Sequence, residues 1–123
     1  MEFFPISILL ALALLAPPMI ARTSKSFVID YDENRFLKDG KPIQIVGGSI
    51  DYFRTLRQQW NDRLATMRAA GINAIQTYVE WSSHEPEEGK FVFKGQQDIV
   101  HFLKLAQQHG FLVFLRPGPY ICA

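Results

Sequence analysis

One pattern occurs twice in this chain: the end of an amphipathic helix, a glycine, and then a buried strand. Residues 67–75 read MRAAGINAI and residues 106–114 read AQQHGFLVF, and the two glycines, Gly71 and Gly110, lie 39 positions apart. Helices and strands that alternate at such a spacing indicate parallel βα units. Strands that are apolar on both faces also require helices packed over them. The pattern therefore favours a parallel α/β fold.

The helix before each glycine is visible in the spacing of apolar residues. Trp60, Leu64 and Met67 recur at intervals of four and three, which predicts one apolar stripe on a helix over residues 57–70. The matching positions of the second helix are Ile99, Phe102, Leu103 and Ala106. Glycine commonly follows a helix end, so Gly71 and Gly110 are the predicted helix stops.

Three apolar runs, rich in β-branched or aromatic residues, predict the core strands. They cover residues 43–50, 74–79 and 111–115, and a further short extended piece is expected over residues 91–93. Ahead of the first core strand, Asp39 and Gly40 form a strong turn signal between extended segments. We interpret this amino-terminal part as a small hairpin lid.

The spacing of the units predicts the architecture. A (β/α)8 barrel takes about 250 residues, or roughly 31 for each unit, so a slightly larger period fits a barrel with elaborated loops. We therefore predict an α/β fold that is an incomplete (β/α)8 TIM barrel: about the first two and a half βα units, preceded by a short β-hairpin. A doubly wound sheet is the alternative. The Gly-x-Gly-x-x-Gly phosphate-binding loop found in many such sheets does not follow any of the strands here. We expect the chain to be the amino-terminal piece of a larger enzyme.

The first residues of the chain are predicted to be a targeting segment. Residues 6–15 form an almost wholly apolar run that is shorter than the about 20 residues of a membrane span, and Pro17 and Pro18 break it. We interpret residues 1–21 as a signal peptide with an uncertain cleavage site, and residues 27–123 as part of a catalytic domain. An uncleaved membrane anchor is the alternative. The expected location is the secretory pathway, in a lysosome, a vacuole or the extracellular space, with no stable membrane association after cleavage.

Composition excludes some partners. The chain is 48% hydrophobic with a net charge of +1, so it has the character of a globular protein and lacks the basic excess expected of a nucleic-acid-binding protein. The single cysteine, Cys122, excludes an internal disulfide framework. No histidine neighbours Cys122 to activate it as a nucleophile, so we expect a buried thiol or a partner that lies outside this chain.

Five motifs occur in order and with consistent spacing over nearly the whole chain after residue 27. They are GSIDYFR at 48–54, Trp60 with DRL at 62–64, GINAIQTYV with Trp81 at 71–81, HEP at 84–86, and LRPGPYICA at 115–123. This set resembles glycoside hydrolase family 35, the β-galactosidases of lysosomal and secreted type. The resemblance implies a (β/α)8 catalytic domain followed by β-rich domains, which removes terminal β-linked galactose with retention of configuration. It implies a β-galactoside carbohydrate substrate and no metal or cofactor, and it leaves a homo-oligomer of the full-length protein open.

The resemblance places the catalytic carboxyl groups outside this chain. A retaining glycosidase needs two carboxyl groups about 5–5.5 Å apart, one as acid and one as nucleophile. In the family both are glutamates at the ends of the fourth and seventh barrel strands, so no catalytic residue is assigned here and the fragment alone is expected to be inactive. Glu80 and Glu85 form a tempting local pair, but hydrogen bonds that brace their loop are the more common role.

Substrate binding is what the resemblance carries over. Tyr78 matches the family tyrosine whose hydroxyl contacts galactose, and Ile121, Cys122 and Ala123 match the segment that lines the sugar pocket. The glutamate that binds galactose hydroxyls would be the next residue, and an Asn-Glu pair and a second glutamate at a strand end are expected later. Aromatic rings suit the apolar faces of sugars, so Trp81 and Tyr120 are further candidates, with core packing as the alternative.

The sequence also predicts structural roles for His84 and Arg116, and it departs from the family pattern at two positions. His84 and Glu85 make a weak metal site, so a structural hydrogen bond is expected for His84, and Arg116 is expected to pair with a carboxylate. Asp51 stands where the family usually has histidine, and Ser82 where asparagine is commoner. A catalytically inactive relative, or a truncated product that at most binds glycans, is therefore the alternative function.

Overall fold

The computed structural model describes residues 25–122, and the chain divides into two units at Ile43 and Gln44. The predicted signal peptide lies outside the described residues, as does Ala123. Among the described residues, no helix has both the length and the apolar character needed to cross a bilayer.

The first unit is a three-stranded antiparallel sheet. Its strands are β1 (Phe27–Asp30), β2 (Arg35–Lys38) and β3 (Lys41–Ile43), in the order β1-β2-β3. Asp39 and Gly40 connect β2 to β3 with positive φ angles of 52° and 74°. Two consecutive positive φ angles are the geometry of a two-residue hairpin turn, so the predicted turn is confirmed. The role of this sheet as a lid stays a prediction.

The predicted strand over residues 43–50 is wrong, because two different sheets share that segment. Ile43 ends β3, where it pairs with Phe36, and only Gly47–Ser49 forms the strand β4 of the second sheet. Between the two strands, the amide of Val46 donates to Oδ1 of Asn73 over 2.8 Å. The bond to Asn73 therefore falls in the interval between the two strands that this apolar run contributes to.

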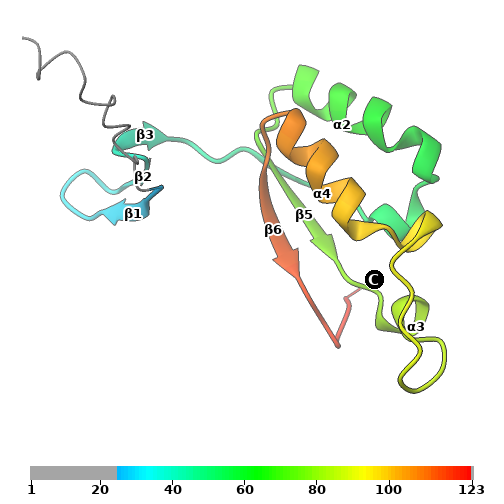
Figure 1. The fold of residues 1–123 in the computed structure, drawn as a ribbon. Helices are drawn as coiled ribbons and strands as arrows, with labels where there is room; N and C mark the ends of the chain where they lie inside the picture. Colours follow the sequence, from blue (N-terminus) through cyan, green and yellow to red (C-terminus); the bar gives the residue numbers. More distant parts are fainter. Residues whose placement is uncertain (1–24, 123) are drawn as a thin grey trace, which may run out of the picture. The chain divides into compact units, whose positions relative to one another are not determined.

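The second unit is a parallel sheet with two helices on one side (Figure 1). Its strands β4, β5 (Ala74–Tyr78) and β6 (Leu112–Arg116) stand in sequence order. Helix α2 (Trp60–Ala69) connects β4 to β5, and α4 (Ile99–Gln108) connects β5 to β6. The predicted parallel α/β fold is therefore confirmed for this part of the chain.

Short helical turns occupy the loops of the second unit. They are α3 (Trp81–His84) and the 3₁₀ turns η1 (Tyr52–Arg54), η2 (Arg57–Gln59) and η3 (Gly95–Gln97). The expected extended piece at residues 91–93 forms no strand. Instead, the amide of Val92 donates to the carbonyl of His84, which holds the segment against the turn α3.

Both helices end in the same way, as the repeated pattern predicts. Gly71 and Gly110 have φ angles of 88° and 73°. Their amides donate to the carbonyls of Arg68 and Gln107, while the next amides, of Ile72 and Phe111, donate to Met67 and Ala106. These paired bonds define the Schellman motif, which needs a left-handed residue just after the helix. Each glycine therefore turns the chain directly from a helix into a strand.

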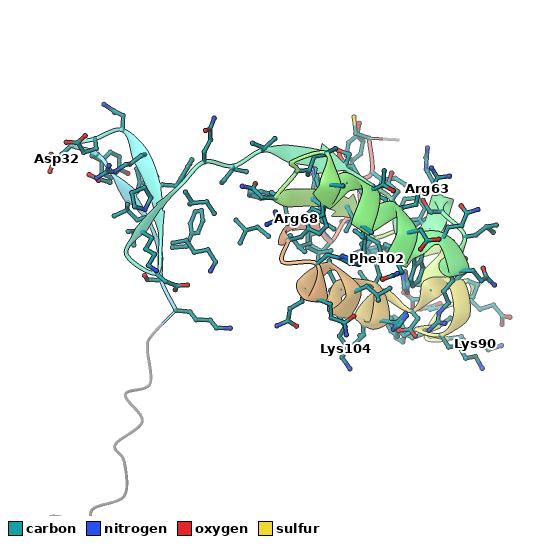
Figure 2. The ribbon with its side chains drawn as sticks, turned by 90° about the horizontal axis from the view of Figure 1, so that it is seen from above. Asp32, Arg63, Arg68, Lys90, Phe102 and Lys104 are labelled. Atoms are coloured by element: carbon teal, nitrogen blue, oxygen red, sulfur yellow. The ribbon has the colours of Figure 1, made fainter. Side chains whose placement is uncertain are left out.

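The core lies between the helices and the sheet. The side chains of Trp60, Leu64, Ile75 and Phe102 are fully buried, which confirms the predicted apolar stripes. Figure 2 shows Phe102 between the two helices, while Lys104 points away from them. Fully burying one such side chain contributes about 1.5–3 kcal/mol. This apolar contact therefore holds the helix pair on the sheet.

Candidate functional site

The carboxyl ends of the three parallel strands carry polar side chains. Asp51, Tyr78 and Arg116 stand at or just after the ends of β4, β5 and β6. Oδ1 of Asp51 accepts a hydrogen bond from the amide of Tyr78 over 3.3 Å, and Oδ2 lies 3.9 Å from Nε of Arg54. The amide of Val79 donates to the carbonyl of Arg116 over 3.0 Å. Ligands of α/β proteins commonly bind at such an edge.

At this edge of the sheet, Tyr78 has a side-chain hydroxyl without a hydrogen-bond partner among the described residues. The residue is 6% exposed, and this hydroxyl is buried. Leaving a buried polar group without a partner costs about 1–3 kcal/mol. A ligand hydroxyl would remove that cost. The predicted sugar contact of Tyr78 stays a prediction.

Arg116 does not make the carboxylate pair that we expected. Its guanidinium carbon lies 4.2 Å from the centroid of the Tyr78 ring, and no ion pair of Arg116 is found in residues 25–122. Tyr78 and Arg116 are directly paired in the register of β5 and β6. The aromatic ring is therefore the neighbour that this position offers, and the carboxylate of Asp51 is engaged by Tyr78 and Arg54 instead.

The sugar-pocket role of the segment after β6 stays a prediction, whereas the burial expected for one of its residues is not found. Ile121 is half-buried, whereas Cys122 is exposed, so the prediction of a buried Cys122 thiol is wrong. The Tyr120 hydroxyl lies 4.0 Å from Sγ of Cys122, and Tyr120 is itself largely exposed. These residues follow the last paired residue of β6, Arg116, so no neighbouring strand covers them in the described part of the chain. Within that part, no hydrogen bond joins Ile121 or Cys122 to Tyr78.

A buried hydrogen-bonded pair, Tyr52 and His84, joins the loops after β4 and β5. Nε2 of His84 lies 2.5 Å from the Tyr52 hydroxyl, and Nδ1 lies 2.8 Å from the carbonyl of Val92. Because a carbonyl only accepts, Nδ1 carries the proton and Nε2 accepts from Tyr52. Burial raises the pKa of Tyr52 to about 12, which keeps the phenol neutral and able to donate. The expected structural hydrogen bond of His84 is confirmed, and residues 25–122 contain no cluster of three or more metal-ligating side chains.

The loops after β5 and β6 are joined through an indole. Nε1 of Trp81 donates to the carbonyl of Pro117 over 2.6 Å. Gly118 has a φ angle of 81°, and a Cβ atom at that position would lie 2.8 Å from the same Nε1. A larger residue would therefore push the two loops apart. Trp81 is thus a structural contact between the loops, although half of its surface stays exposed.

The two local glutamates act within their loop. The carboxylate of Glu80 accepts from the Ser83 hydroxyl, and Oε1 of Glu85 accepts from the amide of Gly89 over 2.8 Å. These bonds confirm the expected loop-bracing role.

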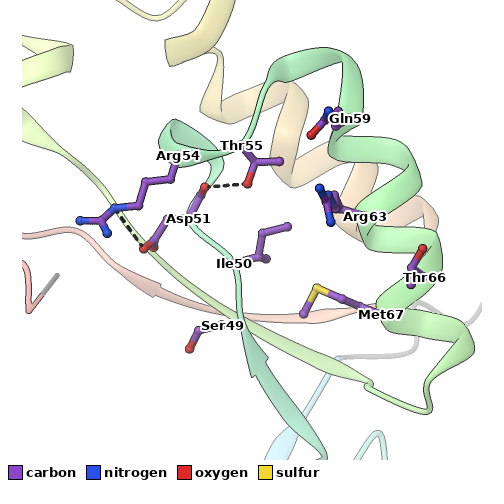
Figure 3. Close-up of a pocket in the computed structure, with 9 residues that line it drawn as sticks. All are labelled: Ser49, Ile50, Asp51, Arg54, Thr55, Gln59, Arg63, Thr66 and Met67. Atoms are coloured by element: carbon purple, nitrogen blue, oxygen red, sulfur yellow. Dashed lines mark hydrogen bonds and ion pairs between the residues drawn. The ribbon is translucent and has the colours of Figure 1, made fainter.

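The described residues also line three cavities that could not be predicted from the sequence motifs. A cavity of about 460 Å³ lies between β4 and α2, and Figure 3 shows Asp51 and Arg54 at one end of it and Arg63 on the helix. A smaller cavity of about 220 Å³ lies beside Trp81 and His84, and a third, of about 370 Å³, is lined partly by Arg116 and Tyr120. The contact of Arg116 with Tyr78 likewise escapes sequence reasoning, because pairing across strands depends on register.

Comparison with known proteins gives consistent results. The sequence model described as Glycosyl hydrolases family 35 matches residues 35–123. The protein named Beta-galactosidase from Felis catus is 54% identical over 120 residues, which are 96% of this chain and 18% of that protein. The Homo sapiens protein of the same name is 52% identical over 118 residues, or 94% of this chain and 17% of that protein. The chain therefore spans less than a fifth of the length of these curated relatives.

A solved structure agrees at the level of the fold. The crystal structure of beta-galactosidase from the psychrophilic Marinomonas ef1 matches with a TM-score of 0.52 and 22% identity. The match covers 58% of this chain and 11% of that one. On the family match and on the identity to these relatives over nearly its whole length, the chain belongs to glycosyl hydrolases family 35.

Proposed function

We propose that this chain is the amino-terminal part of the catalytic (β/α)8 barrel of a retaining exo-β-galactosidase of the secretory pathway. In this proposal β4, β5 and β6 are the first three barrel strands, and their carboxyl ends form one wall of the sugar pocket. The whole protein removes terminal β-linked galactose from oligosaccharides or glycoconjugates. The acid and the nucleophile are glutamates supplied by later strands.

The buried hydroxyl of Tyr78 is the observation that carries the proposal. It sits at the carboxyl end of the central strand β5, where barrel enzymes place their substrates, and it has no partner among the described residues. A galactose hydroxyl can both donate to and accept from a phenol, so it would satisfy this group. Asp51 positions the Tyr78 backbone by accepting a hydrogen bond from its amide.

In this proposal, sugar binding and bond cleavage are carried out by different residues. Tyr78 binds and orients the sugar ring, and the strand ends hold the galactose at a fixed depth in the pocket. A retaining mechanism then proceeds through attack of one carboxylate on the anomeric carbon, while a second carboxyl group protonates the leaving oxygen. The contact with Tyr78 lowers the activation barrier of hydrolysis only to the extent that it holds the sugar ring in its reactive position.

A chimeric enzyme tests the assignment. In it, this chain replaces the 120 residues that it matches in the Felis catus relative. We expect hydrolysis of a chromogenic β-galactoside, and a loss of about tenfold or more in kcat/KM for Tyr78→Phe, which removes one hydroxyl from the site. Tyr31→Phe is the matched control, because Tyr31 is largely exposed in the first unit. A folded chimera without activity would contradict the proposal.

The finer parts of the proposal have their own test. Sequencing the transcript past the codon for Ala123 should show a glutamate first, and later an Asn-Glu pair and a second strand-end glutamate. The anomeric form of the galactose released by that protein, followed by NMR, distinguishes retention from inversion. Absence of either later glutamate would favour the second candidate function, a relative that binds glycans without hydrolysis, to which the departures at Asp51 and Ser82 already point.

A further inference from the structure

We infer that Arg116 is a positioning residue for substrate binding: its guanidinium group holds the Tyr78 ring so that the hydroxyl faces the sugar. This inference rests on the proposed function of the same site. Arg116 then acts on the substrate indirectly, by positioning the Tyr78 ring, and forms no ion pair for this purpose.

The backbone brings the two residues together. Tyr78 and Arg116 are paired in the parallel register of β5 and β6, and directly paired residues on neighbouring strands project to the same face of a sheet. The hydrogen bond from the amide of Val79 to the carbonyl of Arg116 continues this pairing one residue further. The position of Arg116 beside Tyr78 is therefore set by the sheet and not by a flexible loop.

The side chains then make a close contact. The guanidinium carbon lies 4.2 Å from the ring centroid, well inside the about 6 Å at which a cation over an aromatic face is attracted. The other arginine–aromatic contacts in the described residues are looser, at 5.7, 5.8 and 6.0 Å. The planar guanidinium can also stack on the ring, which the ammonium of a lysine cannot do.

Tyr78 is thus held at two points, and no described protein group competes for its hydroxyl. Asp51 accepts from the backbone amide, Arg116 covers the ring, and the hydroxyl has no partner among residues 25–122. A ring already held in its binding orientation loses less rotational freedom when a ligand arrives. Removing the guanidinium should therefore weaken sugar binding only while the Tyr78 hydroxyl is present to be positioned.

A double-mutant cycle in the chimeric enzyme tests this dependence. The variants are Arg116→Ala, Tyr78→Phe and their combination, and the readout is galactose affinity by calorimetry, with KM and kcat measured in parallel. We expect Arg116→Ala alone to weaken galactose binding about threefold to tenfold, the range of a cation–π contact. In the Tyr78→Phe background, the same change should have less than about a twofold effect.

Two further variants separate positioning from stability. Arg116→Lys keeps the charge but loses the planar group, so it should recover only part of the affinity. Arg68→Ala removes an arginine that lies 6.0 Å from the ring centroid of Phe111, away from the strand ends, and should leave galactose affinity unchanged. If Arg116→Ala weakens binding equally in both backgrounds, Arg116 acts on the sugar or on another group directly, and the inference is overturned.

The outcomes also separate this inference from the proposed function. A chimera that binds galactose but does not hydrolyse it contradicts the enzyme assignment, and the cycle can still be read from affinity alone. A chimera that hydrolyses galactosides with no coupling between Arg116 and Tyr78 keeps the function and overturns the positioning role. A folded chimera that does not bind galactose overturns both.

Discussion

Strands β5 and β6 are entered through the same helix, glycine and strand pattern, yet they end in different environments. In β5, four of the five residues are buried, and Ile75 is fully so, whereas in β6 Phe114 and Leu115 are 48% and 42% exposed. The difference lies in their neighbours, because β5 pairs with β4 and β6, while β6 pairs only with β5 in the described part of the chain. A local pattern therefore determines where a strand begins, and its neighbours determine how deeply it is buried.

The largest expected effect contrasts one residue from each strand. Ile75→Ala empties a fully buried site and should destabilise the chimeric enzyme by about 2–5 kcal/mol. Phe114→Ala removes a half-exposed ring and should cost much less. Heat inactivation of galactoside hydrolysis measures both. Equal losses would mean that β6 is as buried as β5 once the longer protein surrounds it.

The segments after β5 and β6 offer a second contrast, because His84, after β5, is held by Tyr52 of η1, whereas Tyr120, after β6, is largely exposed. Tyr52→Phe removes the donor to Nε2 of His84 and leaves that nitrogen buried without a partner, so we expect a loss of about 1–3 kcal/mol. Tyr120→Phe, in the exposed segment after β6, should change stability very little. Urea unfolding followed by tryptophan fluorescence compares the two variants. A neutral Tyr52→Phe would show that another donor reaches His84.

The two glycines should behave alike although the strands they precede do not. Gly71 and Gly110 both have positive φ, and no atom lies within 4 Å of a Cβ added at either position. Replacing each with alanine should therefore cost about 1–2 kcal/mol, the strain of a left-handed L-residue. Thermal unfolding measures the two losses side by side. A much larger loss at Gly71 would show that burial of β5 amplifies the strain.

The smallest effect concerns the start of the helix that leads to β6. The amide of His101 donates to Oδ1 of Asp98 over 3.0 Å, and Nη2 of Arg57 donates to Oδ2 over 3.0 Å. These two bonds, the first more than the second, hold the pKa of the Asp98 carboxyl below its ordinary value. A carboxyl whose folded pKa is lowered stabilises the protein above its unfolded pKa and loses that contribution as the pH falls through the folded pKa.

The matching experiment is a pH series of thermal unfolding. Between neutral pH and the acid range, the melting temperature should fall slightly less in Asp98→Asn than in the unsubstituted chimera, because the variant lacks this titrating group. The analogous helix α2 has no such side-chain cap at its start, so it provides no equivalent acid-sensitive contact. Identical pH profiles would mean that Asp98 contributes nothing through its charge.

Local features of this protein follow from the sequence by itself. The stripe of Trp60 and Leu64, the helix stops at Gly71 and Gly110, and the turn at Asp39 and Gly40 all stand where the residue pattern predicts them. Each depends on the φ and ψ preferences and the spacing of residues that are close in the chain. The family follows as well, because its motifs are contiguous runs of residues.

Only the tertiary structure decided the contacts between distant segments. It divided residues 43–50 between two sheets, placed the guanidinium of Arg116 over the Tyr78 ring where a carboxylate partner was expected, and left Cys122 exposed. Each of these outcomes depends on which strand pairs with which, and in what register. Pairing is settled by the combined burial and hydrogen bonding of segments that lie far apart in the chain, so no short run of residues contains that information.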